Sequence, residues 1–326
     1  MSLEIDFTYQ IDGFFETVNY YRSEEPMNTN QMPEPLNSGI SGLNFTDTTA
    51  EKGKLYYVRF GSVKNNIVKI SDEITFIAGK LWKPLDLSST KVWLNASSYT
   101  APNWVNKIAD TIKFTNSNSS IPSLIDNSLL FTDDYLYSDQ QQVKDLFKNI
   151  SKFWFAITLK QNAQFSLEQA LFTVMKNTDS SRFYLSINPN TNQIRLAIRR
   201  LDSDSAYLKI LLNQSIGSVD SIIIQLDYEV GKIKYSINGV YIEESIPLLG
   251  GPISNTNSTN SIAIGAWLTP DANNTLKDSN IYDIQIGGGN IDEIDRQKLE
   301  GWLAHNYETA NKLPSNHPFK NSPPFI

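Results

Sequence analysis

The sequence predicts an all-β protein of two domains with one amphipathic helix near its C-terminus. Its length of 326 residues, 40% of them apolar, is enough for two hydrophobic cores. Most apolar residues fall in short runs that alternate with polar residues on a period of two, and Asn, Gly and Pro turn signals separate these runs. Only residues 291–307 combine a helical period with a long polar face. These observations favour sandwiches or barrels over a parallel α/β fold.

Residues 1–79 are expected to form the first domain. Alternating apolar residues from Ile5 to Ile11 predict a strand, and Asp12-Gly13 predicts a tight turn that leads to a second strand over 17–21. The Pro-, Asn- and Ser-rich segment 24–42 is expected to be a long surface loop. A hairpin follows, in which 55–63 turns back into 67–70.

The run 45–59 resembles the corner between the fifth and sixth strands of a fibronectin type III domain. The resemblance implies that Tyr56 is the corner tyrosine, which bonds back to the backbone. Residues 20–23 resemble the third strand of such domains, and 70–74 the last strand. An early tryptophan found in many of these domains is absent, so the module is expected to be short and to lack its first strand.

Residues 80–89 are expected to form a linker, and residues 90–326 a second β domain. Predicted strands in that domain are separated by turn signals such as Val230-Gly231 and Asn238-Gly239. They cover 153–160, 170–175, 182–188, 193–201, 207–212, 221–229, 232–238, 261–266 and 281–286.

Residues 221–242, which turn at Asn238-Gly239, resemble the central hairpin of laminin G and concanavalin A-like jelly rolls. Segments 262–267 and 281–286 resemble the closing strands of that fold. The helix over 291–307 and the proline-rich tail over 308–326 resemble the ending of jelly-roll domains in structural proteins of tailed bacteriophages. The resemblance implies a virion protein.

Composition and charge argue against several other classes of protein. A net charge of −7 and a pI near 5.0 provide no general attraction for nucleic acids. No apolar run approaches the roughly 20 residues that span a bilayer, so we expect no membrane insertion. The acidic start has no basic-then-apolar leader, which favours synthesis and assembly in the host cytoplasm. The absence of Cys excludes disulfides and thiolate metal sites.

We expect no catalytic residues, no cofactor and no enzyme activity. No predicted strand carries the alternating carboxylates of laminarinase-type glycoside hydrolases. The acidic cluster at Asp292, Glu293 and Asp295 opens the helix, where carboxylates favour the positive end of its dipole. His305 falls in the last turn of the same helix and is interpreted as a helix-ending residue, while His317 is assigned no chemistry.

Calcium is the one metal that the sequence raises, because laminin G domains often hold this ion at the sandwich rim. Asp271 and Asp278 are weak candidates for its ligands, in a loop over 268–280 next to Trp267. Their spacing follows no known ion-binding loop. We therefore favour a solvated turn and predict no metal.

A ligand-binding face is predicted from the alternation of side chains in the strands of the second domain. With the apolar alternate positions turned inward, Trp154, Tyr184, Arg195 and Arg199 face outward, and Trp267 is added from the neighbouring loop. Aromatic rings and guanidinium groups can stack on a sugar ring and bond its hydroxyl or acidic groups. The same residue types also suit a contact between subunits.

These patterns lead to one functional hypothesis with two alternatives. The leading hypothesis is a non-enzymatic, oligomeric virion protein on a phage tail, baseplate or capsid surface, which serves assembly and display and adheres to host-surface glycans. Many copies on one particle would raise the effective strength of such adhesion. The first alternative is a bacterial cell-surface carbohydrate-binding adhesin, and the second is a glycan-degrading enzyme.

Overall fold

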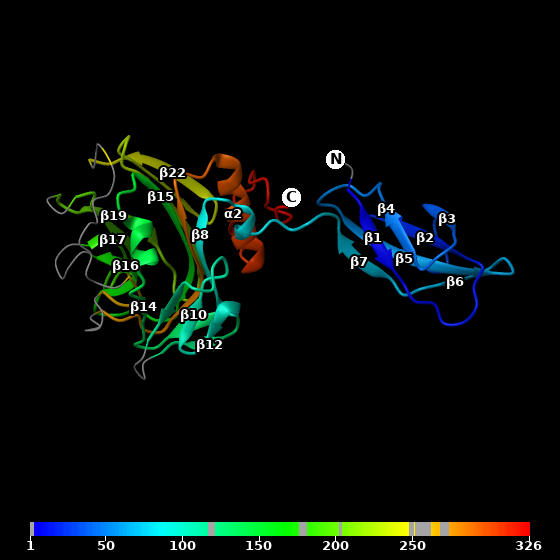
Figure 1. The fold of residues 1–326 in the computed structure, drawn as a ribbon, viewed down its shortest axis with the longest axis horizontal. Helices are drawn as coiled ribbons and strands as arrows, with labels where there is room; N and C mark the ends of the chain where they lie inside the picture. Colours follow the sequence, from blue (N-terminus) through cyan, green and yellow to red (C-terminus); the bar gives the residue numbers. More distant parts are fainter. Residues whose placement is uncertain are drawn as a thin grey trace. The chain divides into compact units, whose positions relative to one another are not determined.

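The computed structural model describes residues 3–116, 121–175, 181–201, 204–247, 251, 262–267 and 274–326. The chain divides into two compact units (Figure 1). The first unit consists of Met1–Trp82 together with Ser322–Ile326, and the second of Lys83–Asn321. Both units are built mainly from antiparallel strands, so the predicted all-β class is confirmed.

The first unit contains two sheets, as far as its described residues show. A five-stranded sheet has the order β3-β2-β5-β6, with β7 beside β5, and a two-stranded sheet pairs β1 with β4. Aromatic rings fill the space between the sheets: the ring of Phe7 lies 5.4 Å from that of Tyr20 and 5.6 Å from that of Phe60. The strands are β1 (Ile5–Thr8), β2 (Thr17–Ser23), β3 (Asn37–Ile40), β4 (Asn44–Asp47), β5 (Leu55–Lys64), β6 (Ile67–Ile70) and β7 (Ile74–Ile77).

The hairpin of β5 and β6 is confirmed, whereas the pairing of the first strand differs from the expected one. β1 does not continue through Asp12-Gly13 into a partner but pairs with β4, with Phe7 opposite Phe45. Packing of Phe7 against rings of the larger sheet places β1 in the facing layer. The segment 24–42 also contains β3, which pairs with β2.

The Tyr56 side chain makes the backbone bond that the sequence predicted. Its buried hydroxyl accepts a hydrogen bond from the backbone N–H of Glu51 at 3.0 Å. The guanidinium of Arg22 stacks on the same ring at 4.4 Å and pairs with Asp47 at 2.5 Å. Tyr56 therefore fastens the segment between β4 and β5 to the larger sheet.

The last five residues belong to the first unit, although the sequence placed them in the tail of the second domain. The N–H of Trp82 donates to the carbonyl of Pro324, and the N–H of Ile326 donates to the carbonyl of Lys80. Leu81 and Phe325 thus form an antiparallel bridge. Residues 83–89 of the expected linker belong to the second unit.

The second unit is an antiparallel β-sandwich of jelly-roll type. Within its described residues, nine strands form one sheet in the order β19-β18-β17-β16-β23-β14-β11-β10-β9. The other sheet has the order β12-β13-β24-β15-β20-β21-β22, with β8 paired to β24. Their bounds are β8 (Thr90–Asn95), β9 (Tyr99–Thr100), β10 (Asn103–Val105), β11 (Lys113–Thr115), β12 (Ser123–Ile125), β13 (Ser128–Phe131), β14 (Leu136–Ser138), β15 (Lys152–Gln161), β16 (Gln169–Met175), β17 (Ser181–Ile187), β18 (Gln193–Ile198), β19 (Tyr207–Asn213), β20 (Val219–Asp227), β21 (Lys232–Ile237), β22 (Val240–Ser245), β23 (Ile262–Ile264) and β24 (Ser279–Gly288).

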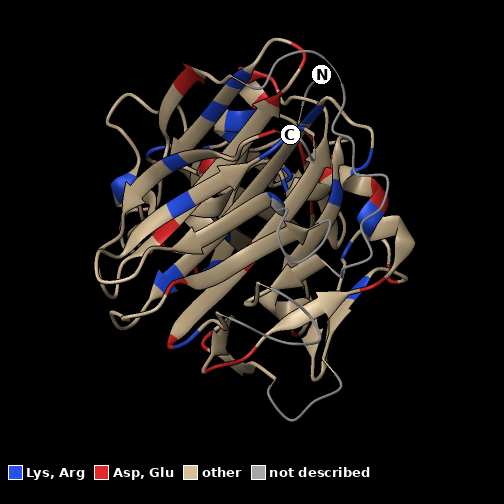
Figure 2. Ribbon diagram, turned by 90° about the vertical axis from the view of Figure 1, so that its left-hand side faces the viewer, with Lys and Arg blue, Asp and Glu red and all other residues tan. Residues whose placement is uncertain are grey.

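The main core lies between these two sheets, because alternate residues of each strand point inward. Phe153 and Phe155 of β15 meet Phe183 of β17 with ring centroids 5.5 and 5.2 Å apart. Charged positions are scattered over the long strands in Figure 2, with blue and red interspersed.

A helix covers the outer face of the sheet that contains β15. This helix, α2 (Glu293–Asn306), is capped by Asp292, whose Oδ1 accepts from the N–H of Asp295 at 2.8 Å, so the capping interpretation is confirmed. Trp302 of the helix meets Trp93 of β8 edge to face at 5.5 Å. The other helices are short: α1 (Gln141–Lys144) and the 3-10 turns Pro84–Asp86, Ala96–Ser98, Asp145–Phe147 and Ala310–Lys312.

Both histidines hold the C-terminal segment against this helix. The ring of His305 bonds the carbonyl of Phe319 at 2.9 Å, and His317 Nε2 donates to buried Glu300 at 2.9 Å. His317 Nδ1 accepts from the N–H of Phe319, which places the proton of the neutral ring on Nε2. In the part of the chain that is described, no helix has the length and apolar character needed to cross a bilayer.

Candidate functional site

The predicted outward-facing residues lie in two different sheets. Trp154 belongs to β15, whereas Tyr184 lies on β17 and Arg195 on β18 of the opposite sheet. Tyr184 is paired with Ala197, and Arg195 is paired with Ser186, so these residues share the outer face of the nine-stranded sheet. The structure therefore brings together Tyr184 and Arg195 but not Trp154.

Trp154 faces outward from the core, as predicted, but it is not available to a ligand. Its side chain is 0% exposed, and its Nε1–H donates to Ser89 Oγ at 3.1 Å. The backbone of Gly287 on the neighbouring strand leaves just enough space for the indole. The expectation of an exposed ring is wrong, because the segment before β8 packs against the indole at Ser89.

Tyr184 and Trp267 form an aromatic pair on the outer face. Their ring centroids lie 5.1 Å apart at an interplanar angle of 32°, and small side chains, Ala170 and Ala197, pack beside them. Trp267 Nε1 is a buried polar atom without a hydrogen-bond partner in the described residues, whereas the Tyr184 hydroxyl interacts with the side chains of Ser186 and Asn274. Burial raises the pKa of Tyr184 well above its usual value, so its hydroxyl stays protonated.

A charged pair adjoins the aromatic pair. Glu168 Oε1, in the segment before β16, accepts from Ser186 Oγ at 2.7 Å and also from Arg195 Nη2. The side chains of Arg195 and Glu168 remain 27% and 18% exposed, whereas Arg195 Nε is buried and has no acceptor in the described residues. The guanidinium of Arg195 thus offers hydrogen-bond donors and the carboxylate of Glu168 offers acceptors. The bonds to Arg195 on β18 and to Ser186 on β17 hold the carboxylate in place.

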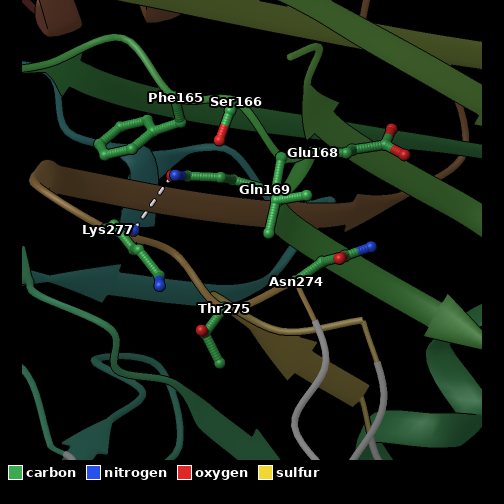
Figure 3. Close-up of a pocket in the computed structure, with 8 residues that line it drawn as sticks. Phe165, Ser166, Glu168, Gln169, Asn274, Thr275 and Lys277 are labelled. Atoms are coloured by element: carbon green, nitrogen blue, oxygen red, sulfur yellow. Dashed lines mark hydrogen bonds between the residues drawn. The ribbon is translucent and has the colours of Figure 1, made fainter.

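A pocket of ≈ 180 Å³ opens between the segments 165–169 and 274–277. Figure 3 shows the Phe165 ring on one side of it and Asn274 and Thr275 on another. The amide side chain of Gln169 accepts from the N–H of Lys277 at 3.0 Å, which joins the two segments. Leu167 at the rim is 70% exposed. Because Glu168 belongs to both features, the pocket and the charged pair form one site.

Arg199 lies beyond the end of β18, away from this pocket. Its backbone N–H donates to the carbonyl of Arg182 at 3.1 Å, and its Nε is buried without a partner among the described residues. Arg182 is buried, donates to the carbonyl of Arg200 at 2.9 Å, and has a pKa lowered by that burial. Arg199 is therefore not among the residues that line the pocket.

Only one of the two calcium candidates lies within the described residues. Asp271 lies outside the described residues, and Asp278 is exposed, with its carbonyl accepting from the N–H of Asn162 at 2.8 Å. Where the structure describes the chain, no three acidic or histidine side chains converge on a position for a metal.

Glu168, Gln169 and Asn274 were missed because they are not part of the outward-facing strand pattern. Glu168 precedes β16, Gln169 is the first residue of that strand, and Asn274 lies in a loop far away in sequence. Arg195 was the one residue in the sequence that could have pointed to Glu168. A guanidinium group on a partly covered face needs a carboxylate partner. Which carboxylate that is depends on the fold.

No protein-family model and no curated protein matches the chain. Among solved structures, the chain is similar to a Trypanosoma rangeli sialidase in complex with sialic acid, at 10% identity and a TM-score of 0.51. The match covers 79% of this chain and 44% of the sialidase, so this chain spans less than half of that protein's length.

A second structure of that sialidase matches at 11% identity over 77% of this chain and 43% of its own, with a TM-score of 0.49. A structure of botulinum neurotoxin type C, whose cell entry depends on interaction with two ganglioside molecules, matches at 14% identity over 66% of this chain and 51% of its own, with a TM-score of 0.46. At these identities, the sialidase match at 0.51 shows a shared fold.

This similarity corrects the expectation that the protein is not an enzyme. A sialidase is a glycan-degrading enzyme, and a part of its fold, 44% of its chain, matches 79% of this chain. The β fold and the missing laminarinase-type carboxylate pattern are therefore no grounds for placing the protein outside the enzymes.

Proposed function

We propose that the second unit binds carbohydrate through the site formed by Tyr184, Trp267, Arg195 and Glu168. The observation that carries the proposal is the partly exposed pair of Arg195 and Glu168, which adjoins a pocket of ≈ 180 Å³ and an aromatic pair. Beside them, Trp267 Nε1 and Arg195 Nε are buried without a partner in the described residues, which is rare in proteins.

Carbohydrate suits these groups better than an apolar ligand does. Sugar hydroxyls both donate and accept, which matches the carboxylate of Glu168 and the guanidinium of Arg195. A sugar ring also has an apolar face that can lie on Leu167 or on an aromatic side chain. The Trypanosoma rangeli sialidase of similar fold was solved in complex with sialic acid, which is consistent with a glycan as the ligand here.

We further propose that this binding serves adhesion and display on the surface of a tailed bacteriophage, with a bacterial cell-surface adhesin as the alternative. This part of the proposal rests on the resemblance of the C-terminal helix and tail to phage jelly-roll domains. Antibody labelling of particles by electron microscopy tests it. Label on a tail, baseplate or capsid supports the phage assignment, whereas label confined to bacterial cells supports the adhesin.

The full-length chain, tested on an array of neutral and sialylated oligosaccharides, would show whether the site binds glycans. We expect Arg195→Gln to weaken binding to any retained glycan at least tenfold, because it removes a charge-assisted donor. Arg59→Gln is the matched control, since Arg59 pairs in the first unit with Glu73, which is 18% exposed, as Glu168 is. Retention of no glycan, or equal loss in both variants, contradicts the proposal.

A second pair of variants tests the aromatic part of the site. Trp267→Phe keeps a ring but removes the Nε1 donor, so we expect several-fold weaker binding. Trp302→Phe, on the helix of the opposite face, should leave binding unchanged. Equal affinity of Trp267→Phe and the parent would exclude Trp267 from the site.

A further inference from the structure

Strand β6 at the edge of the first unit has open hydrogen-bonding groups. In the described residues it pairs only with β5 and ends the sheet order. Its apolar side chains are unusually exposed for a strand, with Ile67 at 71% and Val68 at 40%. An edge of this kind is a template for pairing with another strand.

The hairpin turn determines which backbone groups of β6 are free. Asn65 and Asn66 both have positive φ, at 52° and 58°, as in a two-residue type I′ turn. Lys64 and Ile67 close this turn, so they exchange hydrogen bonds, and the next pair, Val63 with Val68, does not. The N–H and C=O of Val68 therefore point away from β5, toward the open edge.

The open edge is short. Ile70 and Ile74 are four positions apart, but their partners on β5, Gly61 and Val58, are only three apart. One extra residue thus interrupts the edge between β6 and β7 and bends it. A strand that adds to this edge can extend along β6 alone.

We propose that two copies of this protein associate through antiparallel pairing of their β6 strands about a two-fold axis. In such a pairing, residues on the same face of the sheet lie opposite one another, so Val68 meets Val68 of the second copy and Lys69 meets Ile67. The two Val68 residues exchange both of their free backbone hydrogen bonds. A shift of the pairing by one residue in each copy would place the two Lys69 side chains opposite each other. Repulsion between these like charges disfavours that alternative pairing.

Charge complementarity supports a second copy as the partner. The pairing brings exposed Asp72, just beyond β6, beside the hairpin tip of the other copy, which carries exposed Lys64. The two-fold axis repeats this contact. Phe14, 74% exposed and covered on one side by the Lys64 side chain at 5.0 Å, adds apolar surface at the same tip. The interface is smaller than that of a stable dimer, so we expect weak association that depends on concentration.

Sedimentation velocity of the full-length chain, from micromolar to millimolar concentration, tests the proposal. We expect a monomer–dimer equilibrium in the parent and at least a tenfold lower association constant in Val68→Lys. Ser38→Lys is the matched control, because it adds the same charge to β3 at the opposite edge of the sheet. A parent that stays monomeric throughout, or equal weakening by both variants, overturns the proposal.

A proline variant separates backbone pairing from apolar contact. Val68→Pro removes only the N–H that faces the open edge, so the first unit should retain its near-ultraviolet circular dichroism while dimerisation is lost. Phe14→Ala should weaken the dimer less than Val68→Pro does. If Phe14→Ala abolishes the dimer and Val68→Lys leaves it intact, the tip and not the edge strand is the interface, and the proposal fails.

Discussion

The carboxyl group of Asp283 provides the sharpest test of how the second unit is stabilised. It lies on the outer face of β24, fully buried, where Trp93 Nε1 and the Tyr307 hydroxyl donate to Oδ2 at 2.9 and 2.8 Å. Gln285 donates to Oδ1 at 2.8 Å. Burial raises the pKa of Asp283 to about 6, although these hydrogen bonds oppose the rise.

The sign of the pH dependence follows from the raised pKa. Between pH 4 and 6 the folded protein keeps this proton and the unfolded chain, with the usual pKa of 3.8, releases it. The free energy of unfolding therefore falls as the pH rises through this window and is level above it. A rise of about two pKa units corresponds to a loss of about 3 kcal/mol by pH 7.

Asp283→Asn should remove this loss. An asparagine at 283 stays neutral, and its Oδ1 can still accept from Trp93 and Tyr307. Its Nδ2 faces Gln285, whose Oε1 is buried without a partner in the described residues and can accept after the amide turns. Hydrogen bonds to the amide are expected to be weaker than those to the carboxyl group by about 1 kcal/mol in total. Subtracting this from the loss of about 3 kcal/mol, we expect the variant to be more stable than the parent by about 2 kcal/mol at pH 7.5.

Urea unfolding at pH 4.5 and 7.5, followed by tryptophan fluorescence, measures the effect. Trp82 is the one tryptophan of the first unit, so the signal reports mainly on the second. Asp126→Asn is the control, because Asp126 is exposed and its positive φ of 46° suits asparagine equally well. The reasoning is refuted if Asp283→Asn is the less stable protein at pH 7.5, or if both variants show the parent's pH dependence.

Two further predictions concern packing and a backbone bond. Gly287→Ala would place a methyl group 2.1 Å from Nε1 of Trp154, so it should destabilise the second unit by about 3 kcal/mol or more in urea unfolding. Gly288→Ala meets no atom within 4 Å and should be nearly neutral; equal losses would contradict the packing argument. Tyr56→Phe removes the acceptor of a backbone N–H and should cost the first unit about 1–2 kcal/mol in calorimetry. Tyr57→Phe, on the other face of the strand, should cost little, and a larger loss there would disprove the role of Tyr56.

Features that depend on neighbouring residues in the chain could be predicted from the sequence. The strand over 152–161 and the hairpin of β5 and β6 follow from side-chain alternation and turn residues. The cap at Asp292 follows from the preference of carboxylates for a helix start, and the bond made by Tyr56 follows from a resemblance over a short segment. Each of these contacts joins groups within a few residues or within one hairpin.

Features that depend on which surfaces meet were decided by the tertiary structure. Alternation placed Trp154 on the outer face of its strand, but only the packing of a distant segment buried it. It also placed Arg195 on an outer face, without identifying Glu168 as its partner. The last five residues joined the first unit through bonds to Lys80 and Trp82. The periodicity of the sequence indicates which side chains share one face of a single strand or helix. Which segment covers that face, and which residue pairs with a side chain on it, depends on long-range contacts whose free energy is distributed over the whole fold.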